Sequence, residues 1–332
     1  MPVERSYCIA IRTLGKAGEK YQKLLNSILH QTIQPQKVLV YIPFGYDLPS
    51  ERIGNEIFVR CEKGMVAQRS LQLDIITTDY CLFCDDDISF PANFVEKLFH
   101  ELLKNDGDCI SPDSFRNHLC PIYTKILNSI KWASPRKPDK WAFKINKYTS
   151  SFSYNNAPQC ATLKSQSAAF PCFLCKMEVF RKIHFEDERW LDSFSYASGD
   201  DQLFFYKMFL MGFKLLVNYD SNIEHLDGKT SRIGDDERQK YRNGVFIRFC
   251  LWYRSCFKLK DNRKTDKLLC MLFFASKLSI IYLYHIIWSL SRGRFYRLTD
   301  FFSSLSHAYK YVHSEEYLKY PSYDFHIQNK TK

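Results

Sequence analysis

The chain has 332 residues, 45% of them hydrophobic, which is enough for a substantial buried core and excludes an intrinsically disordered protein. It has 12 cysteines and begins without an apolar leader, so we expect free thiols in a reducing compartment rather than a secreted disulfide scaffold. Most of the formal net charge of +11 falls within residues 241–332, which hold 16 Lys and Arg against 6 Asp and Glu. The rest of the chain is nearly neutral, so an anionic partner, nucleic acid or a membrane surface, should bind the C-terminal part.

The first third of the chain alternates apolar runs with helical patterns. In chain order, we expect strands at 7–11, 37–42, 57–60 and 80–84, and helices at 21–29, 63–76 and 95–103. Strands that alternate with helices are typical of a largely parallel sheet covered on both faces. No Gly-x-Gly-x-x-Gly follows the first strand and no Walker loop occurs, which argues against dinucleotide-binding and P-loop proteins.

This rhythm is interrupted by residues 112–165, which are rich in Pro, Lys and Tyr. We expect a long insertion over one end of the sheet, in which Trp132 or Trp141 could stack on a sugar or simply pack. Beyond it we expect a strand at 168–175, a helix through 179–180, a helix from 200 to 211 that stops at Gly212, a strand at 214–217 and a short segment at 223–226.

Three consecutive carboxylates, Asp85, Asp86 and Asp87, end the apolar strand at 80–84. Like charges at a strand end repel one another unless a cation lies between them or water screens them. One interpretation is an acidic turn, and the other is a divalent metal site, because Mg²⁺ and Mn²⁺ prefer oxygen ligands. Open α/β sheets place ligand sites at the carboxyl ends of strands, which favours the metal site.

Two Cys-x-x-Cys pairs, Cys81/Cys84 and Cys172/Cys175, raise the alternative of a zinc site. Both pairs enclose apolar residues in strand-like runs, whereas zinc ligands usually flank a tight turn. We therefore expect these cysteines to be core residues.

Taken together, these pieces resemble a family 2 glycosyltransferase with the GT-A fold, in which helices flank a mostly parallel central sheet. The resemblance covers roughly residues 5–230. It rests on the early strand and helix, residues 63–70, the Asp triplet, the segment from Phe185 to Glu188, and the pair Asp200-Asp201 with Gly212 behind it. An Asp triplet alone is a weak signal, but a triplet followed 115 residues later by an acidic pair that opens a Gly-ended helix is specific.

The resemblance implies roles for the acidic residues. Asp85 resembles the carboxylate that touches the ribose of the donor and is also expected to be a metal ligand. Asp87 resembles the one that binds Mn²⁺ or Mg²⁺ through the diphosphate. Asp201 resembles the general base, and Asp200 the first acid of the same pair. Because Asp201 opens a helix, we expect it to stay ionised at neutral pH. His225 falls where many members carry a metal- or phosphate-contacting His, although a lone His after a strand is often structural.

On the donor side, Arg69 resembles the basic residue near the diphosphate, and Arg12-Thr13 the first-strand loop beside the nucleotide. Lys63 and Asp86 are the other expected donor contacts. Arg12 and Arg69 can also be read as surface cations. The chain departs from the family where the second strand usually ends in an acid that holds the base: here the sequence is Ile42-Pro43-Phe44, with Asp47 a few residues later.

The reaction implied is a single displacement with inversion, from a nucleotide sugar to a hydroxyl of a growing or lipid-linked glycan in cell-surface polysaccharide synthesis. A divalent cation neutralises the leaving diphosphate, and a base takes the proton of the acceptor hydroxyl. Two alternatives are a sugar-phosphate nucleotidyltransferase, for which Leu14-Gly15-Lys16-Ala17-Gly18 is a poor loop, and a non-catalytic glycan- or nucleic-acid-binding protein. No recognisable nucleic-acid module accompanies the basic tail, so we expect no nucleic-acid partner.

The C-terminal part contains a long apolar run, Leu268 to Leu290, which is long enough to span a bilayer. Lys277 near its middle disfavours simple spanning, and the five polar positions of the run scatter around a helix at 100° per residue. With the basic residues that flank the run, this pattern favours peripheral association with an anionic membrane surface over spanning or soluble packing.

These features predict two parts. Residues 1–235 should form a GT-A catalytic domain with the acceptor-side insertion at 112–165, and residues 236–332 a basic, aromatic-rich helical extension. We expect the protein to be cytoplasmic, on the inner face of the cell membrane.

Overall fold

The computed structural model describes residues 6–115, 140–194, 198–226, 236–323 and 325. Its main sheet consists of β1 (Tyr7–Arg12), β2 (Lys37–Pro43), β3 (Glu56–Cys61), β4 (Tyr80–Asp85), β6 (Cys109–Pro112), β9 (Thr162–Ser165), β10 (Cys172–Lys176) and β11 (Leu215–Asn218). Two short antiparallel pairs lie outside it, β5 (Ile88–Ser89) with β12 (Glu224–His225), and β7 (Phe143–Ile145) with β8 (Phe152–Tyr154).

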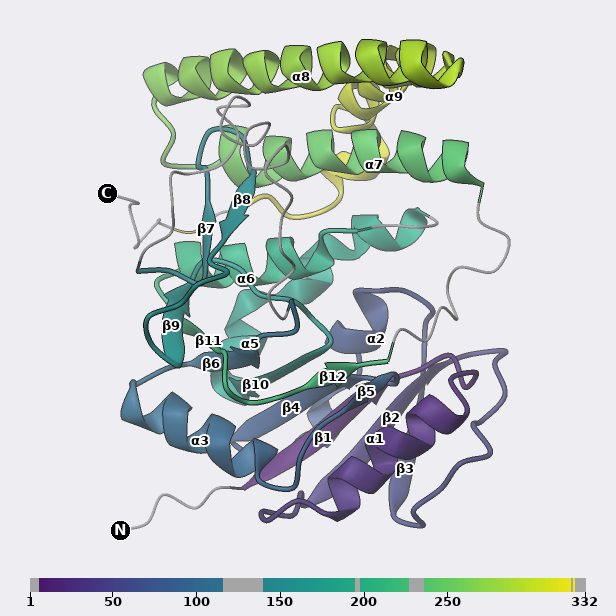
Figure 1. The fold of residues 1–332 in the computed structure, drawn as a ribbon, viewed down its shortest axis with the longest axis vertical. Helices are drawn as coiled ribbons and strands as arrows, with labels where there is room; N and C mark the ends of the chain where they lie inside the picture. Colours follow the sequence, from purple (N-terminus) through teal and green to yellow (C-terminus); the bar gives the residue numbers. More distant parts are fainter. Residues whose placement is uncertain (1–5, 116–139, 195–197, 227–235, 324, 326–332) are drawn as a thin grey trace.

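The eight strands of the sheet follow the order β3-β2-β1-β4-β10-β6-β11-β9 (Figure 1). The first four are mutually parallel, β11 is parallel to β6, and β10 and β9 run antiparallel to their neighbours. The predicted α/β architecture with a mostly parallel sheet is thus confirmed. Because β1 and β4 are parallel neighbours, their carboxyl ends meet at one edge of the sheet.

The helices that follow the strands are α1 (Glu19–Leu29), α2 (Ala67–Ser70), α3 (Phe94–Lys104), α5 (Met177–Ile183) and α6 (Asp200–Leu210), with 3-10 turns η1 (Leu73–Ile75) and η2 (Phe185–Ser193). The helix expected over 63–76 is wrong in extent. Gln72 adopts a left-handed conformation with φ 56°, which separates the four residues of α2 from η1. The helix that ends before Gly212 is confirmed, and Gly212 has the positive φ of 95° expected of a C-terminal stop.

Two hydrophobic clusters cover the two faces of the sheet, because side chains alternate along each strand. On β1, Cys8 and Ala10 face one cluster, whereas Tyr7, Ile9 and Ile11 face the other. The second cluster is closed by the apolar faces of α1 and α3, and the first by α5, α6 and η2. The first cluster continues without a break into the C-terminal helices.

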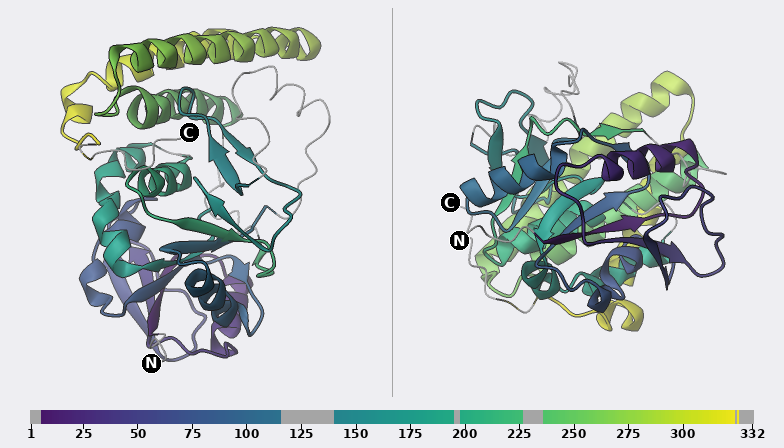
Figure 2. Two further views of the ribbon diagram at one scale, coloured as in Figure 1. Left: turned by 90° about the vertical axis from the view of Figure 1, so that its left-hand side faces the viewer. Right: turned by 90° about the horizontal axis from the view of Figure 1, so that it is seen from below.

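Those C-terminal helices are α7 (Glu237–Trp252), the π-helical turn η3 (Tyr253–Phe257), α8 (Lys264–Arg292), α9 (Tyr296–Tyr311) and α10 (Glu315–Leu318). They form layers above α6, with α8 outermost (Figures 1 and 2). The predicted helical extension is confirmed. Among the described residues, α8 is the one helix whose length and apolar composition would suffice to cross a membrane.

A buried ion pair joins these layers to the sheet region. Glu188 is fully buried and accepts two hydrogen bonds from Arg254 of η3, at 2.5 and 3.1 Å, and one from the Trp190 indole at 2.9 Å. Lys207 of α6 lies 3.7 Å from the same carboxylate. Burial raises the pKa of Glu188, but the charges of Arg254 and Lys207 more than offset it, so the pKa is lowered.

The described part of the insertion forms the β7–β8 hairpin and the edge strand β9. Three consecutive carbonyls of the hairpin turn accept hydrogen bonds from three different helices: Tyr148 from Trp252 at 2.8 Å, Thr149 from Lys277 at 3.0 Å and Ser150 from Gln202 at 2.6 Å. We call Tyr148–Ser150 the clamped turn. Trp141 packs edge-on against Phe209 at 5.7 Å, which supports a packing role, and Trp132 lies outside the described residues.

Candidate active site

Charged side chains from four elements form a continuous chain at the carboxyl edge of the sheet. Arg12 lies 3.0 Å from Asp85, Asp85 lies 2.7 Å from Arg69, and Arg69 lies 3.1 Å from Asp200. We call these four residues the ion-pair chain. It brings together the end of β1, α2, the end of β4 and the start of α6, so these predicted site residues do share one location.

The strand register accounts for the first link. Arg12 is directly opposite Asp85 in the parallel pairing of β1 with β4, so both side chains leave the sheet at the same level. The Arg12 guanidinium donates two hydrogen bonds of 3.2 Å to the two Asp85 oxygens. A two-pronged contact of this kind fixes both the position and the plane of the carboxylate. Arg12 is therefore not the free surface cation that one interpretation allowed.

Arg69 is the centre of the chain, and it is buried. Its guanidinium stacks 4.3 Å from the centre of the Phe170 ring while it bonds Asp85 and Asp200. The α2 backbone is held by Asp192, whose carboxylate accepts hydrogen bonds from the amides of Val66 and Ala67 at 2.9 and 3.0 Å.

The contact of Asp192 explains why Gly64 precedes α2. A Cβ on Gly64 would lie 2.3 to 2.5 Å from the Asp192 carboxyl group, so no larger residue fits there without displacing it. Sequence reasoning missed both Asp192 and Phe170. No periodic pattern marks Asp192. Its position soon after the Phe185–Glu188 segment is the one signal that could have suggested it.

Asp86 and Thr13 form a second, buried link between β1 and β4. The Thr13 hydroxyl donates to an Asp86 oxygen at 2.5 Å, and both side chains are buried. Burial raises the pKa of Asp86 to about 7, against the opposing effect of the Thr13 hydrogen bond. This pair holds the first-strand loop against the triplet, and direct contact of either residue with a donor stays a prediction.

Asp87 and His225 face each other across the β5–β12 pairing. His225 is opposite Ile88 in the register, and its Nε2 lies 3.3 Å from Asp87 Oδ1. Both side chains are partly exposed. An oxygen and a nitrogen at this separation fit neighbouring positions around one divalent cation, with diphosphate oxygens completing the shell. Two of the predicted metal ligands, Asp87 and His225, thus lie in contact, and metal binding by them stays a prediction.

Asp85 does not fit the predicted role of metal ligand in this arrangement. Both of its oxygens accept hydrogen bonds from arginines, Oδ1 from Arg12 and Arg69 and Oδ2 from Arg12. Within the described ranges, no group of three His, Cys, Asp or Glu side chains is placed to hold a metal. The four cysteines of the zinc alternative do not share one site: Cys84 and Cys172 pack in the hydrophobic cluster on one face of the sheet, and Cys81 and Cys175 in the cluster on the other.

The two acidic residues at the start of α6 have different partners. Asp200 is buried and engaged by Arg69. Asp201 is partly buried, and its Oδ1 accepts the Gln202 amide at 2.7 Å. Burial and then the neighbouring Asp200 carboxylate raise the pKa of Asp201 to about 7. The expectation that Asp201 is fully ionised at neutral pH is therefore wrong, because these two effects exceed that of the helix N-terminus.

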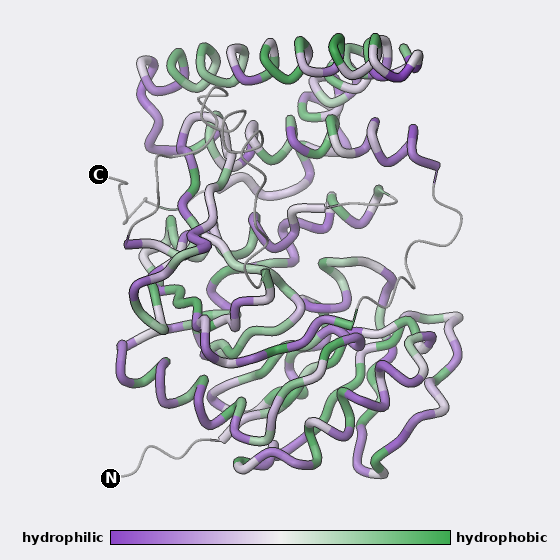
Figure 3. The backbone as a smooth tube through the Cα atoms, in the orientation of Figure 1, coloured by the Kyte–Doolittle hydropathy of each residue, from purple (hydrophilic) through white to green (hydrophobic). Residues whose placement is uncertain are grey.

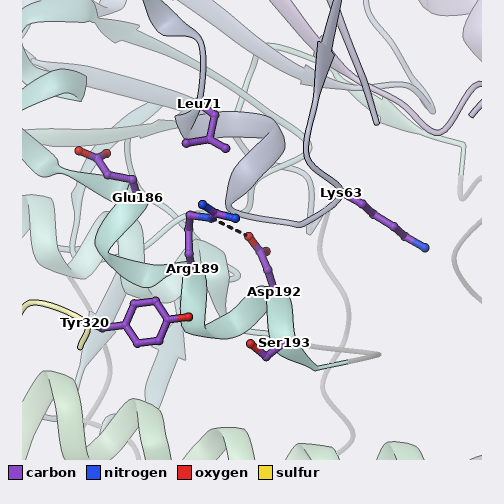
Figure 4. A pocket seen from close by; sticks show the side chains of 7 residues that line it. All are labelled: Lys63, Leu71, Glu186, Arg189, Asp192, Ser193 and Tyr320. Carbon is purple, nitrogen blue, oxygen red and sulfur yellow. Dashed lines mark ion pairs between the residues drawn. The ribbon is translucent and has the colours of Figure 1, made fainter. Parts of the chain in front are cut away.

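Lys63 was predicted to bind the donor, but it lies apart from the ion-pair chain. Its ammonium donates to the Tyr46 hydroxyl at 2.6 Å. It borders a pocket of about 660 Å³ together with Leu71, Glu186, Arg189, Asp192, Ser193 and Tyr320. In Figure 4 its side chain points away from the other lining residues. The pocket borders the site through Asp192, which supports α2, and Leu71, which directly follows α2.

Comparison with known proteins gives structural likenesses without sequence relatives. The fold is similar to that of S. aureus TarS residues 1–349 in complex with UDP-GlcNAc, with a TM-score of 0.51 and 11% sequence identity, over 91% of this chain and 80% of that one. S. aureus TarS itself gives a TM-score of 0.46 at 12% identity, and the 81% of this chain that aligns spans 43% of the TarS chain. No protein-family model and no curated protein matches the sequence. The chain thus has a GT-A type fold with a C-terminal helical extension.

Proposed function

We propose that this protein is a metal-dependent, inverting glycosyltransferase that moves a sugar from a nucleotide-sugar donor to a hydroxyl of a glycan or lipid-linked glycan. The observation that carries the proposal is the ion-pair chain. Through Asp85, Arg69 and Asp200 it ties the strand-end triplet, suited to a nucleoside diphosphate and its cation, to the acidic pair that supplies a base. Donor binding and proton removal need separate carboxylates at one site, and this protein has both.

The donor diphosphate would lie beside Arg12 and Arg69, the two cations at the carboxyl edge of the sheet. Both are fixed by Asp85, so they would meet a diphosphate without reorganising, which favours binding. The likeness to TarS residues 1–349 in complex with UDP-GlcNAc supports a nucleotide sugar as the donor class.

Asp87 and His225 are the residues that would hold Mn²⁺ or Mg²⁺. When bound, such a cation neutralises the charge that develops on the departing diphosphate. The protein contributes the position of the two ligands, set by the β5–β12 pairing.

Asp201 would accept the proton of the acceptor hydroxyl as the new glycosidic bond forms and the sugar–diphosphate bond breaks. A base with a pKa of about 7 combines substantial ionisation with strong basicity at neutral pH. Asp200 would position rather than react, since its carboxylate is held by Arg69.

The test is a panel of nucleotide sugars with Mn²⁺ or Mg²⁺, in which release of nucleoside diphosphate and transfer to glycan acceptors are measured. Metal-dependent diphosphate release from one sugar nucleotide supports the proposal. Release of pyrophosphate from a nucleoside triphosphate and a sugar phosphate would instead identify a nucleotidyltransferase. Binding of glycans with no turnover of any donor would leave a non-catalytic protein.

A further inference from the structure

Helix α8 buries polar side chains and exposes large apolar ones, the reverse of a helix at the surface of a soluble protein. Its buried side carries Cys270, Phe274, Lys277, His285 and Ser289. Its outward side carries large apolar residues, among which Leu272 is 57% exposed, Ile287 67% and Leu290 68%. A Lys is among the residue types least often buried, so this orientation is specific rather than incidental.

Lys277 accounts for the orientation. Its ammonium donates to the Thr149 carbonyl of the clamped turn at 3.0 Å and lies 5.7 Å from the centre of the Phe274 ring. At 100° per residue, the exposed Leu272 and Leu283 project from the side of the helix opposite Lys277. Of the five polar positions, Lys277, His285 and Ser289 share the buried side, whereas Ser276 and Ser279 are exposed, so the expected scatter holds for only part of the run.

The resulting surface is long, and its two apolar ends are separated by the small exposed residues Ala275, Ser276 and Ser279. We define the outer stripe as Leu268, Leu272, Leu283, Ile287 and Leu290, all exposed. It follows most of the 29 residues of α8, and Phe302 and Tyr309 of α9 are exposed as well. Figure 3 shows hydrophobic segments along the whole α8 tube, at the edge of the molecule. Large apolar side chains exposed along one side of a helix mark an interaction site.

Positive charge borders both ends of the outer stripe. Arg263 and Lys264 are exposed before it, and Arg292 and Arg294 after it. Acidic residues offset part of this charge: Asp266 lies at the same end as Arg263, Glu237 of α7 lies 3.6 Å from Arg294, and Asp300 is buried in ion pairs with two arginines of α7. A second copy packed antiparallel on this helix would bring basic ends against basic ends, which disfavours a dimer here. An anionic lipid surface matches both the apolar stripe and its basic ends.

We propose that α8 docks flat on an anionic lipid bilayer, with the outer stripe at the boundary between headgroups and acyl chains. The helix does not span the membrane, because its other side is covered by protein from Cys270 near its start to Ser289 near its end. This docking is independent of the proposed glycosyl transfer, since it involves neither the ion-pair chain nor Asp201.

The experiment is co-sedimentation of the purified full chain with vesicles of phosphatidylcholine alone or with about 30% phosphatidylglycerol, without nucleotide or metal. We expect binding to the anionic vesicles, and strong weakening in about 0.5 M sodium chloride because screening shortens the reach of the charges. Leu272→Asp and Ile287→Asp should each lower the partition coefficient about tenfold or more, because each replaces an inserted apolar side chain by a charge.

Leu29→Asp is the matched control, since Leu29 is an equally apolar residue that is exposed on α1. It should leave vesicle binding unchanged, and all three variants should keep the wild-type melting temperature. Absence of binding at low salt, or equal loss in the control, would overturn the proposal. Retention on vesicles after alkaline carbonate extraction would show spanning instead. A lipid-free dimer in sedimentation velocity that Ile287→Asp dissociates would show that the stripe is a self-interface.

Discussion

At the carboxyl edge of the sheet, each of the four side chains of the ion-pair chain is paired with a side chain of opposite charge. On α8, by contrast, the mid-helix charge of Lys277 points into the protein and the apolar side chains point out. The first arrangement suits a charged ligand, whereas the second suits an apolar ligand. The same chain therefore has two surfaces suited to different phases, and Glu188 and the clamped turn connect them.

The largest effect should come from the base. Asp201→Asn keeps the shape of the side chain and removes its basicity, so the transfer rate should fall by about 10²–10⁴-fold. Donor affinity should persist, because Arg12, Arg69 and Asp87 are untouched. The measurement compares turnover and donor binding for Asp201→Asn and Asp200→Asn.

Asp200→Asn tests the division of labour in this pair. It weakens the hold on Arg69, so it should reduce donor affinity more than Asp201→Asn does. Near-normal transfer by Asp201→Asn together with lost transfer by Asp200→Asn would mean that the roles are exchanged.

The next effect concerns the link between the two regions. Glu188→Ala leaves Arg254 buried without its carboxylate and should cost about 3–5 kcal/mol of unfolding free energy. Urea unfolding followed by circular dichroism measures it, with Glu224→Ala, at an exposed position of β12, as the control. Because one hydrophobic cluster runs from the sheet into α7 and α9, both regions should lose stability together in a single transition. Separate transitions would mean that the helical layers fold on their own.

A smaller effect separates the metal ligands from the positioning residues. Asp87→Ala should lower the metal-dependent affinity for a nucleoside diphosphate by more than the roughly 10–100-fold typical of a second-sphere partner. His225→Ala should act in the same direction. Calorimetry with and without Mn²⁺ measures both. An unchanged metal-dependent affinity in Asp87→Ala would place the cation elsewhere.

The smallest effect is the pH dependence of transfer. A base must be ionised to accept a proton, and burial raises the pKa of Asp201 to about 7. The rate should therefore rise with pH up to about 7 and level off above it, with about a tenfold loss per pH unit on the acid side. A bound cation and donor would shift this midpoint. A rate that stays flat from pH 5 to 8 at saturating donor would exclude Asp201 as the base.

Much of the sheet region was predictable because its signals are local. Apolar runs gave the strands and placed Arg12 and Asp85 at strand ends, and the resemblance to GT-A glycosyltransferases implied that Asp201 belongs to the same site. The extent of α2 was not predictable, since a left-handed Gln72 and a cap from Asp192 depend on residues far away in the chain. The raised pKa of Asp201 was missed for another reason: burial, which no local pattern shows, raises it most, and the adjacent Asp200 adds to it.

The orientation of α8 lay beyond sequence reasoning for a different reason. Counting polar positions around a helix assumes that polar side chains face water, and here the Thr149 carbonyl supplies a polar partner inside the protein. The sequence pattern contained Lys277 as an obstacle to spanning, and the contact shows it as the residue that turns the apolar side outward. A pattern of polarity therefore indicates a helix face only once its partners are known.

The clamped turn also limits how the site can open and close. Its three carbonyls are bonded to α6, α7 and α8, and breaking each hydrogen bond costs about 0.5–1.5 kcal/mol. A lid that hinged at this turn would have to break all three at once, so this end of the β7–β8 hairpin is a fixed anchor. Gln202, which bonds it, directly follows Asp201, so the rigid turn sets the register of α6 against the C-terminal helices. Any closure of the site around an acceptor must then come from segments other than this turn. The side of the site that faces the C-terminal helices is therefore rigid.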